Sequence, residues 1–165
     1  MSIVEWLRLR RGAALEPVHF VIAFSSGSHQ SLLHLDLSEC SRLDDAGVMA
    51  IASHCPNLGS LTLAWCWEVT DVGIACVVNK CQFLINLNLC GVVRLLGDFL
   101  PGVANLRGIK LLDLEQCPDI ELSDLQILLS VKKVLLNTPP TIFNVTKIIL
   151  IFSRIWLSKN IMERR

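Results

Sequence analysis

Residues 32–58 read LLHLDLSECSRLDDAGVMAIASHCPNL, and residues 58–84 read LGSLTLAWCWEVTDVGIACVVNKCQFL. Both stretches place apolar residues, cysteine, aspartate and glycine in the same order. Each matching position follows its equivalent at one constant offset, as Leu58 follows Leu32 and Cys66 follows Cys40. A fixed period of this length, about 26 residues, is typical of chains built from stacked structural units. The repeat therefore determines the architecture.

Two further units follow with weaker matches. They begin near residues 84 and 109, so the starts at 32, 58, 84 and 109 are almost evenly spaced. The fourth unit keeps its cysteine at Cys117. In the third unit, Cys90 comes two positions early, and Gly97-Asp98 replaces the expected Thr-Asp pair. We therefore predict about four repeats, of which the third is degenerate.

The spacing inside one unit predicts a strand followed by a helix. Leu35 and Leu37 alternate, so both side chains point to one face of a short strand. Cys40 comes just after that strand, where a small thiol is buried at little cost. The segment 45–55 then changes to helical spacing. Asp44 or Asp45 is well placed to cap its first turn.

One strand and one helix are too small to bury their own apolar faces. Stacked neighbours make one continuous core, as in a solenoid. The sequence therefore predicts an α/β right-handed solenoid, with a parallel sheet inside the arc and helices outside it.

The shared pattern is L-x-x-L-x-L-x-x-C-x-x-[LV]-[TD]-D-x-G-[VI], which in the first unit closes in A-x-x-C. It resembles the cysteine-containing class of leucine-rich repeats, which occurs mainly in F-box/leucine-rich-repeat proteins. The resemblance covers about residues 32–130 and is specific in the first two units. It implies a leucine-rich-repeat solenoid that binds proteins and does not catalyse a reaction.

The same resemblance implies a place in ubiquitin-dependent degradation. In that family the F-box docks the adaptor of an SCF-type ligase, and the repeats hold the protein substrate. Residues 1–31 are too few for an F-box, so we expect SCF subunits only through a longer form. The alternatives are a regulatory scaffold or inhibitor without ligase coupling, and a truncated form without function.

Composition excludes several classes of protein. The chain has 165 residues, of which 52% are hydrophobic and 18% charged, and fifteen basic residues balance fifteen acidic ones. Such a chain is not disordered, and it lacks the basic surplus that favours nucleic acid or a membrane surface. Seven cysteines, an odd number without C-x-x-C spacing, favour buried thiols in the cytoplasm or nucleus. We expect no cofactor and no metal.

The two ends differ from the repeats. We expect residues 1–31 to form an N-terminal cap or degenerate repeat, with residues 18–24 as its helix and His29 in the place of Cys55. After residue 130 the register fails, and Pro139-Pro140 cannot lie in a central strand. Residues 131–165 are therefore predicted to be an irregular tail or cap.

The candidate binding residues are those that alternate with the buried leucines on the concave face, together with two tryptophans at its rim. They are His34, Asp36, Ser38, Ser60, Thr62, Trp65, Trp67, Asn86, Asn88, Asp113 and Glu115. Exposed tryptophan is typical of interface hot spots. The alternatives are a solvated face without a ligand, and indoles that pack on the neighbouring turns.

Catalytic and metal sites are disfavoured by the same pattern. His34, Asp36 and Ser38 are the residue types of a hydrolytic triad, but alternation places them in a row along one strand. A triad needs side chains that converge, usually from different elements. Cys55 and Cys81 are explained as core residues of the repeat. We therefore predict a protein that is not an enzyme.

Overall fold

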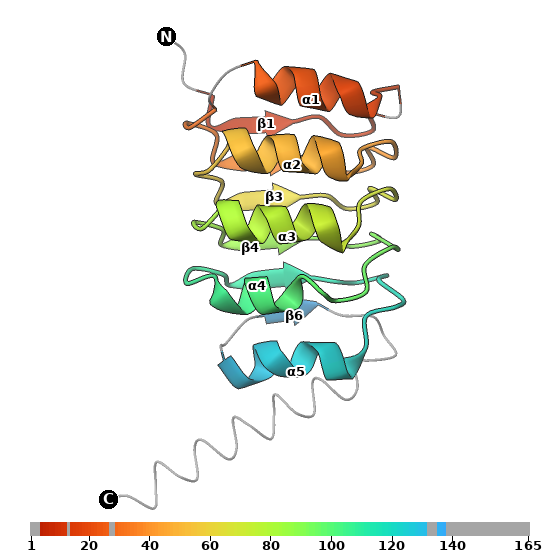
Figure 1. Cartoon of the computed structure of the whole chain (residues 1–165), viewed down its shortest axis with the longest axis vertical. Coiled ribbons are helices and arrows are strands. Elements are labelled where there is room, and N and C mark those ends of the chain that lie inside the picture. The colour runs from red at the N-terminus through yellow and green to blue at the C-terminus, as the bar shows by residue number, and fades with distance from the viewer. Residues whose placement is uncertain (1–3, 13, 27–28, 132–134, 138–165) are drawn as a thin grey trace, which may run out of the picture.

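A computed structural model describes residues 4–12, 14–26, 29–131 and 135–137. The described part is a stack of strand–helix units, with the helices in one layer and the strands in another (Figure 1). The strands are β1 (Trp6–Arg8), β2 (His34–Asp36), β3 (Ser60–Thr62), β4 (Asn86–Asn88), β5 (Leu111–Asp113) and β6 (Leu135–Asn137). The helices are α1 (Pro17–Ser25), α2 (Asp45–His54), α3 (Asp71–Lys80), α4 (Leu100–Asn105) and α5 (Leu122–Val131).

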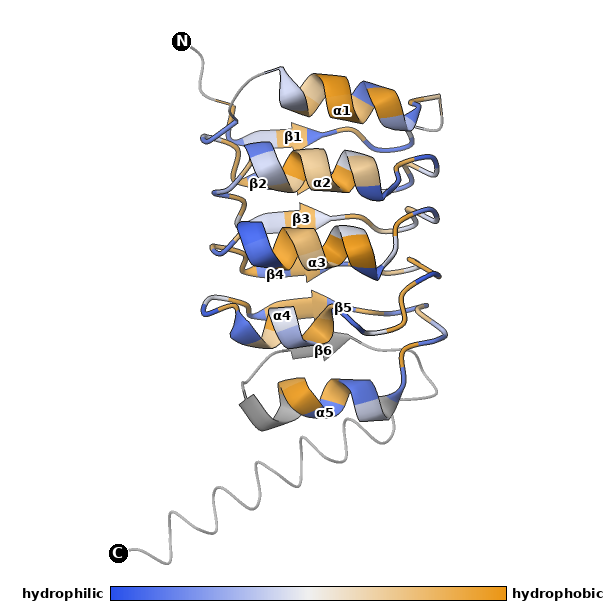
Figure 2. Ribbon diagram, in the orientation of Figure 1, coloured by the Kyte–Doolittle hydropathy of each residue, from blue (hydrophilic) through white to orange (hydrophobic). Residues whose placement is uncertain are grey.

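The strands form one parallel sheet in chain order, β1 to β6. Its register places the central leucines of β1 to β5 in one row: Leu7, Leu35, Leu61, Leu87 and Leu112. From Leu35 onward this row is at most 2% exposed. Hydrophobic residues recur in the strands β1 to β5 and in the helices beside them (Figure 2). The predicted α/β solenoid is confirmed.

The structure assigns different roles to the two aspartates at the start of α2. Asp44 is the N-cap, and its carboxylate accepts a hydrogen bond from the Gly47 amide at 3.0 Å. Asp45 instead reaches the next unit, where its carboxylate accepts bonds from the Thr70 amide, the Thr70 hydroxyl and the Gly73 amide. One aspartate therefore caps its own helix, and the other holds the start of the following helix.

The stack extends beyond the four predicted repeats at both ends. β1 pairs with β2 through Trp6 and His34, which are farther apart along the chain than His34 and its next partner Ser60. β6 pairs with β5 through Leu135 and Leu111, which are closer along the chain than His34 and Ser60 are. Neither spacing matches the constant offset, so a fixed period does not find these strands. β6 lies in the predicted tail, of which residues 132–134 and 138–165 are outside the described part.

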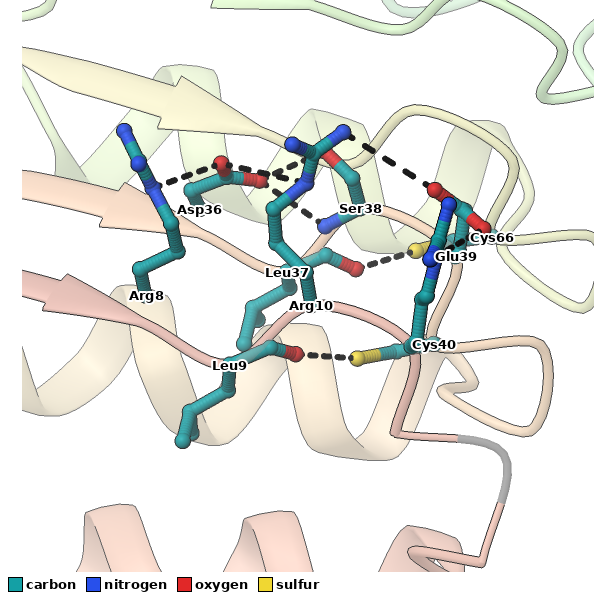
Figure 3. Close-up of polar contacts among 10 residues, drawn as sticks. Arg8, Leu9, Arg10, Asp36, Leu37, Ser38, Glu39, Cys40 and Cys66 are labelled. Carbon is teal, nitrogen blue, oxygen red and sulfur yellow. Dashed lines mark hydrogen bonds and ion pairs between the residues drawn. The ribbon is translucent and has the colours of Figure 1, made fainter.

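The repeat cysteines are buried as predicted. Cys40, Cys66 and Cys117 are fully buried, and each thiol donates to a carbonyl of the preceding unit. The acceptors are Leu9, Leu37 and Leu89, at 2.9, 3.2 and 3.2 Å. Figure 3 shows the first two of these contacts. Burial raises the pKa of the Cys66 and Cys117 thiols to about 12, so both stay protonated donors at neutral pH.

Within the described residues, no helix is both long and apolar enough to cross a membrane.

Candidate protein-binding surface

Two rows of side chains cross the solvent face of the sheet. The register aligns Trp6, His34, Ser60, Asn86 and Leu111 in one row, and Arg8, Asp36, Thr62, Asn88 and Asp113 in the other. The side chains of β2 to β4 in these rows are half-buried, so a partner could reach them. The predicted residues of these strands therefore do share one surface.

Ser38 is an exception among the predicted binding residues. It is only 4% exposed, because it lies past the end of β2, where the chain turns over the core. Its hydroxyl donates to the Asp36 carboxylate at 2.5 Å, and its amide donates to the same oxygen at 3.0 Å. The prediction that Ser38 is exposed on the concave face is therefore wrong: this side chain is buried and supports the turn.

Three of the predicted polar residues also end their own strands. Asp36, Asn88 and Asp113 each accept a hydrogen bond from the amide two positions later in the chain. A side-chain oxygen used in this way imitates a turn of the backbone. These residues thus shape the face as well as lying on it.

Five charged residues that were not predicted as a group form a cluster at the N-terminal end of the face. Arg8 contacts the Asp36 carboxylate at 3.2 Å, and Arg10 lies between the carboxylates of Asp36 and Glu39, at 3.7 and 3.8 Å. Arg11 contacts Glu39 at 3.0 Å. Figure 3 shows Arg8 and Arg10 projecting from the first unit toward the second. Recognising β1 in the sequence would have placed these arginines on the face.

Trp6 is a second residue of this face that the repeat pattern did not reveal. Its indole stacks on the His34 imidazole, with ring centres 3.9 Å apart and planes 17° apart. Trp6 is 65% exposed, so the stack presents a flat aromatic surface at the end of the sheet. His34 is therefore held by an aromatic contact as well as by its strand.

The rim of the sheet carries the two predicted tryptophans. Trp65 and Trp67 are 41% and 50% exposed, so both point away from the core as predicted. Together with Glu39 and Ser41 they line a pocket of about 350 Å³. Trp65 also packs on the next turn: a Cβ added to Gly91 would lie 2.5 Å from the indole. Both interpretations of this indole, exposure and packing, thus hold in part.

A second, more apolar pocket lies where the strands begin. It has a volume of about 410 Å³ and is lined mainly by side chains that precede or start β2 to β4. Phe83 is 66% exposed and Ile85 is 40% exposed, while His34 and Asn86 bring this pocket to the edge of the concave face.

The arrangement of His34, Asp36 and Ser38 does not suit hydrolysis. The Ser38 hydroxyl donates directly to the Asp36 carboxylate, while the His34 ring stacks on Trp6. A nucleophilic serine needs a base as its immediate partner and the acid behind that base. The observed order therefore gives serine no activating base.

Cys90 lies beside two carboxylates at the other end of the face. Its sulfur and one oxygen each of Asp113 and Glu115 lie within 4.8 Å of one another. Burial, followed by the charges of Asp113 and Glu115, raises the pKa of the Cys90 thiol. The thiol is therefore protonated at neutral pH, a form that is a poor nucleophile and a poor metal ligand.

The concave face is small, and its size limits how stably it can bind a partner without the rim. Six parallel strands at about 4.8 Å spacing span about 24 Å, where the four predicted strands would span about 15 Å. A stable interface buries about 800 Å² on each partner, more than a sheet of such short strands offers. The rim must therefore contribute to any stable complex.

Comparison with known proteins agrees with this geometry. The Leucine Rich repeat family matches residues 28–52 and 54–78, which contain β2 with most of α2 and β3 with most of α3. Comparison with the curated proteins found no relative. Leucine-rich repeats generally form protein-binding modules. The two matched repeats and the stacked units around them make this chain an α/β leucine-rich-repeat solenoid.

Proposed function

We propose that this chain recognises a protein partner through its concave face and rim, and that the partner is a substrate of an SCF-type ubiquitin ligase. The observation that carries the first part is the row of half-buried polar side chains on a parallel sheet, bordered by exposed indoles. Aromatic residues next to polar rows are the usual composition of a recognition surface.

Support for the ligase pathway comes from the type of repeat. The cysteine that follows β2, β3 and β5, with its thiol bonded to the preceding unit, is the feature that resembles F-box/leucine-rich-repeat receptors. In such a pathway the repeats hold the substrate, and ligase subunits join through an F-box. A regulatory scaffold or inhibitor without ligase coupling would use the same surface.

We place the protein in the cytoplasm or nucleus. All seven cysteines are free thiols, and five of them are buried in the described core. A reducing compartment keeps thiols in this state. We also propose that the chain is not an enzyme, because Asp36, Asn88 and Asp113 on the face serve turns and ion pairs.

Affinity capture with paired variants tests the function. Thr62→Arg adds a large cation to the middle of the concave face, and Val72→Arg adds the same group to α3, where Val72 is 62% exposed. We expect Thr62→Arg to reduce capture of a specific partner about tenfold or more, and Val72→Arg to leave it unchanged. Equal loss with both variants, or with neither, would contradict recognition through the face.

The ligase branch needs its own readout. We expect the captured partner to be ubiquitinated in cells and to accumulate when cullin ligases are inhibited. A partner whose capture depends on Thr62, but whose lifetime in cells does not change under cullin inhibition, would contradict the SCF assignment. It would indicate a scaffold or inhibitor instead.

A further inference from the structure

We propose that the rim pocket formed by Glu39, Ser41, Trp65 and Trp67 binds an arginine side chain of the partner protein. This inference rests on the proposed function and names the chemistry that one part of the surface recognises. The pocket is open to solvent and has a volume of about 350 Å³, at the small end of the range for ligand sites. It suits one long side chain better than a separate small molecule.

The pocket is built from the same two positions of two successive turns. Glu39 and Ser41 flank Cys40, and Trp65 and Trp67 flank Cys66. The buried cysteines fix the backbone between each pair, since each thiol is bonded to the preceding unit. Adjacent parallel strands are about 4.8 Å apart, so the four side chains are held as neighbours.

Backbone conformation aims two of these side chains. Glu39 and Trp65 have φ of 64° and 63°, in the left-handed region that residues other than glycine rarely adopt. The turn before each repeat cysteine therefore directs these side chains to the rim. The indole of Trp65 lies against Gly91, which has φ of 71°, so this wall of the pocket is supported from behind.

The chemistry of the walls favours a guanidinium group. A cation over the face of an indole is attracted by the ring's quadrupole, and arginine also stacks flat on aromatic rings. In the described residues, the aromatic contacts involve Trp6 and Phe24, so no Lys or Arg of this part lies over Trp65 or Trp67. The Glu39 carboxylate and Ser41 hydroxyl supply acceptors for the guanidinium N–H groups.

Arg11 and Arg10 compete for the same carboxylate. They contact Glu39 at 3.0 and 3.8 Å, but their side chains are 80% and 52% exposed. Exposed ion pairs of this kind contribute little to stability. An arginine that enters the pocket also stacks on the indoles, which Arg11 does not, and can therefore replace Arg11 at Glu39.

This competition gives two variants opposite expected effects. Glu39→Gln removes the charge that the ligand needs, while Arg11→Gln removes the competitor. Glutamine is compatible with the backbone here, because Gln116 has φ of 62° at the equivalent position of a later turn. A role in folding alone would change binding in the same direction for both variants.

The test uses the full chain labelled with ¹⁵N, and two probes of nearly the same shape. Nα-acetyl-arginine methylamide carries the charge, and Nα-acetyl-citrulline methylamide does not. We expect the arginine probe to shift the indole N–H signals of Trp65 and Trp67 with a dissociation constant of about 1–10 mM, as fits a single side chain. The citrulline probe should bind about tenfold more weakly, and the exposed Trp6 signal should stay in place.

Three variants extend the test to the residues that line or compete for the pocket. Glu39→Gln should weaken binding of the arginine probe about three- to fivefold, Trp67→Leu about tenfold, and Arg11→Gln should strengthen it about twofold. Equal binding of both probes, an equal shift at Trp6, or weaker binding with both Glu39→Gln and Arg11→Gln would overturn the proposal.

Failure of this inference is separable from failure of the proposed function. Val72→Arg on α3, outside the pocket and the concave face, should leave the binding of the arginine probe unchanged. If the probe shows no preference for charge while Thr62→Arg still abolishes partner capture, the pocket assignment is wrong and the recognition function stands. If the probe binds as expected but capture does not depend on Thr62, the role of the concave face is wrong.

Discussion

The unit at residues 58–83 and the unit at residues 84–108 are neighbours in the stack, but they are held together differently. In the first, α3 has ten residues, and its N-cap Thr70 accepts a bond from the Val72 amide. In the second, α4 has six residues and begins after Phe99 without a side-chain cap. The first unit thus has a side-chain cap on its helix and the second has none, although the Asp71 carboxylate accepts bonds from the amides of Leu96, Gly97 and Phe99 ahead of α4.

The buried rows of the two units are nevertheless the same. Leu61 and Leu63 are at most 1% exposed, and so are Leu87 and Leu89. Val92 takes the place of the repeat cysteine and is also fully buried. Stacking thus requires apolar volume at fixed positions, whereas the thiol and the helix cap add stability to a core that forms without them.

The greatest loss of stability is expected from substitutions in the buried leucine rows that the two units share. Leu61→Ala should lower the free energy of unfolding by about 3–4 kcal/mol, because it leaves a cavity in a fully buried row. Leu87→Ala in the degenerate unit should cost the same within about 1 kcal/mol. Urea denaturation followed by circular dichroism measures both values. A much smaller loss for Leu87→Ala would show that the third unit is not packed as tightly as the second.

The next effect concerns the aspartates that join units. Asp45→Ala should cost about 2–3 kcal/mol, since its carboxylate accepts three bonds from Thr70 and Gly73 in the following unit. Asp44→Ala removes one cap bond and should cost about 1 kcal/mol. The same denaturation assay compares them. Equal losses would mean that contacts between units are no stronger than an ordinary helix cap.

A smaller effect is expected where Trp65 meets the degenerate unit. Gly91→Ala should cost about 1–2 kcal/mol, because Gly91 has φ of 71° and the new Cβ would displace the indole. Gly59→Ala is the matched control, since the nearest atom to a Cβ there is 3.7 Å away. Tryptophan fluorescence should change in Gly91→Ala alone. An unchanged spectrum would contradict the contact between Trp65 and Gly91.

The least change in stability is expected from exchanging the residues that distinguish the two units. Cys66→Val should cost about 1 kcal/mol, because the Leu37 carbonyl loses its thiol donor. Val92→Cys, the reverse change in the third unit, should alter stability by less than about 1 kcal/mol. Thermal unfolding measures both. A loss well beyond that of one ordinary hydrogen bond in Cys66→Val would mean that the thiol is essential to stacking.

Features that repeat at a constant spacing could be predicted from the sequence. The strands at Leu35 and Leu61, the burial of Cys40 and Cys66, and a helix cap at Asp44 or Asp45 all follow from the alternation and the constant offset between units. β1 and β6 were missed because β1 is farther from β2 along the chain, and β6 nearer to β5, than this offset. A loop of different length changes the offset between two strands without changing the strands themselves. A search for a constant period therefore cannot detect a strand that follows such a loop.

The candidate surface was predicted less completely, for a different reason. Alternation gives the side of a strand on which Asp36 or Asn88 lies, but not the bonds that these side chains make. Whether Ser38 faces solvent or turns back onto Asp36 depends on the backbone after the strand. To predict the pocket between Glu39 and Trp67, one must know how far apart two successive turns lie in space. The spacing of residues within one turn does not give that distance.

Hydrogen exchange in the presence of the captured partner is the decisive measurement of recognition through the concave face and rim. We predict slower amide exchange in residues 33–41 and 59–67, and unchanged exchange in the helices α2 and α3. These helices cover the opposite face of the sheet (Figure 1). Protection confined to α2 and α3, with residues 33–41 and 59–67 unchanged, would contradict recognition through this surface.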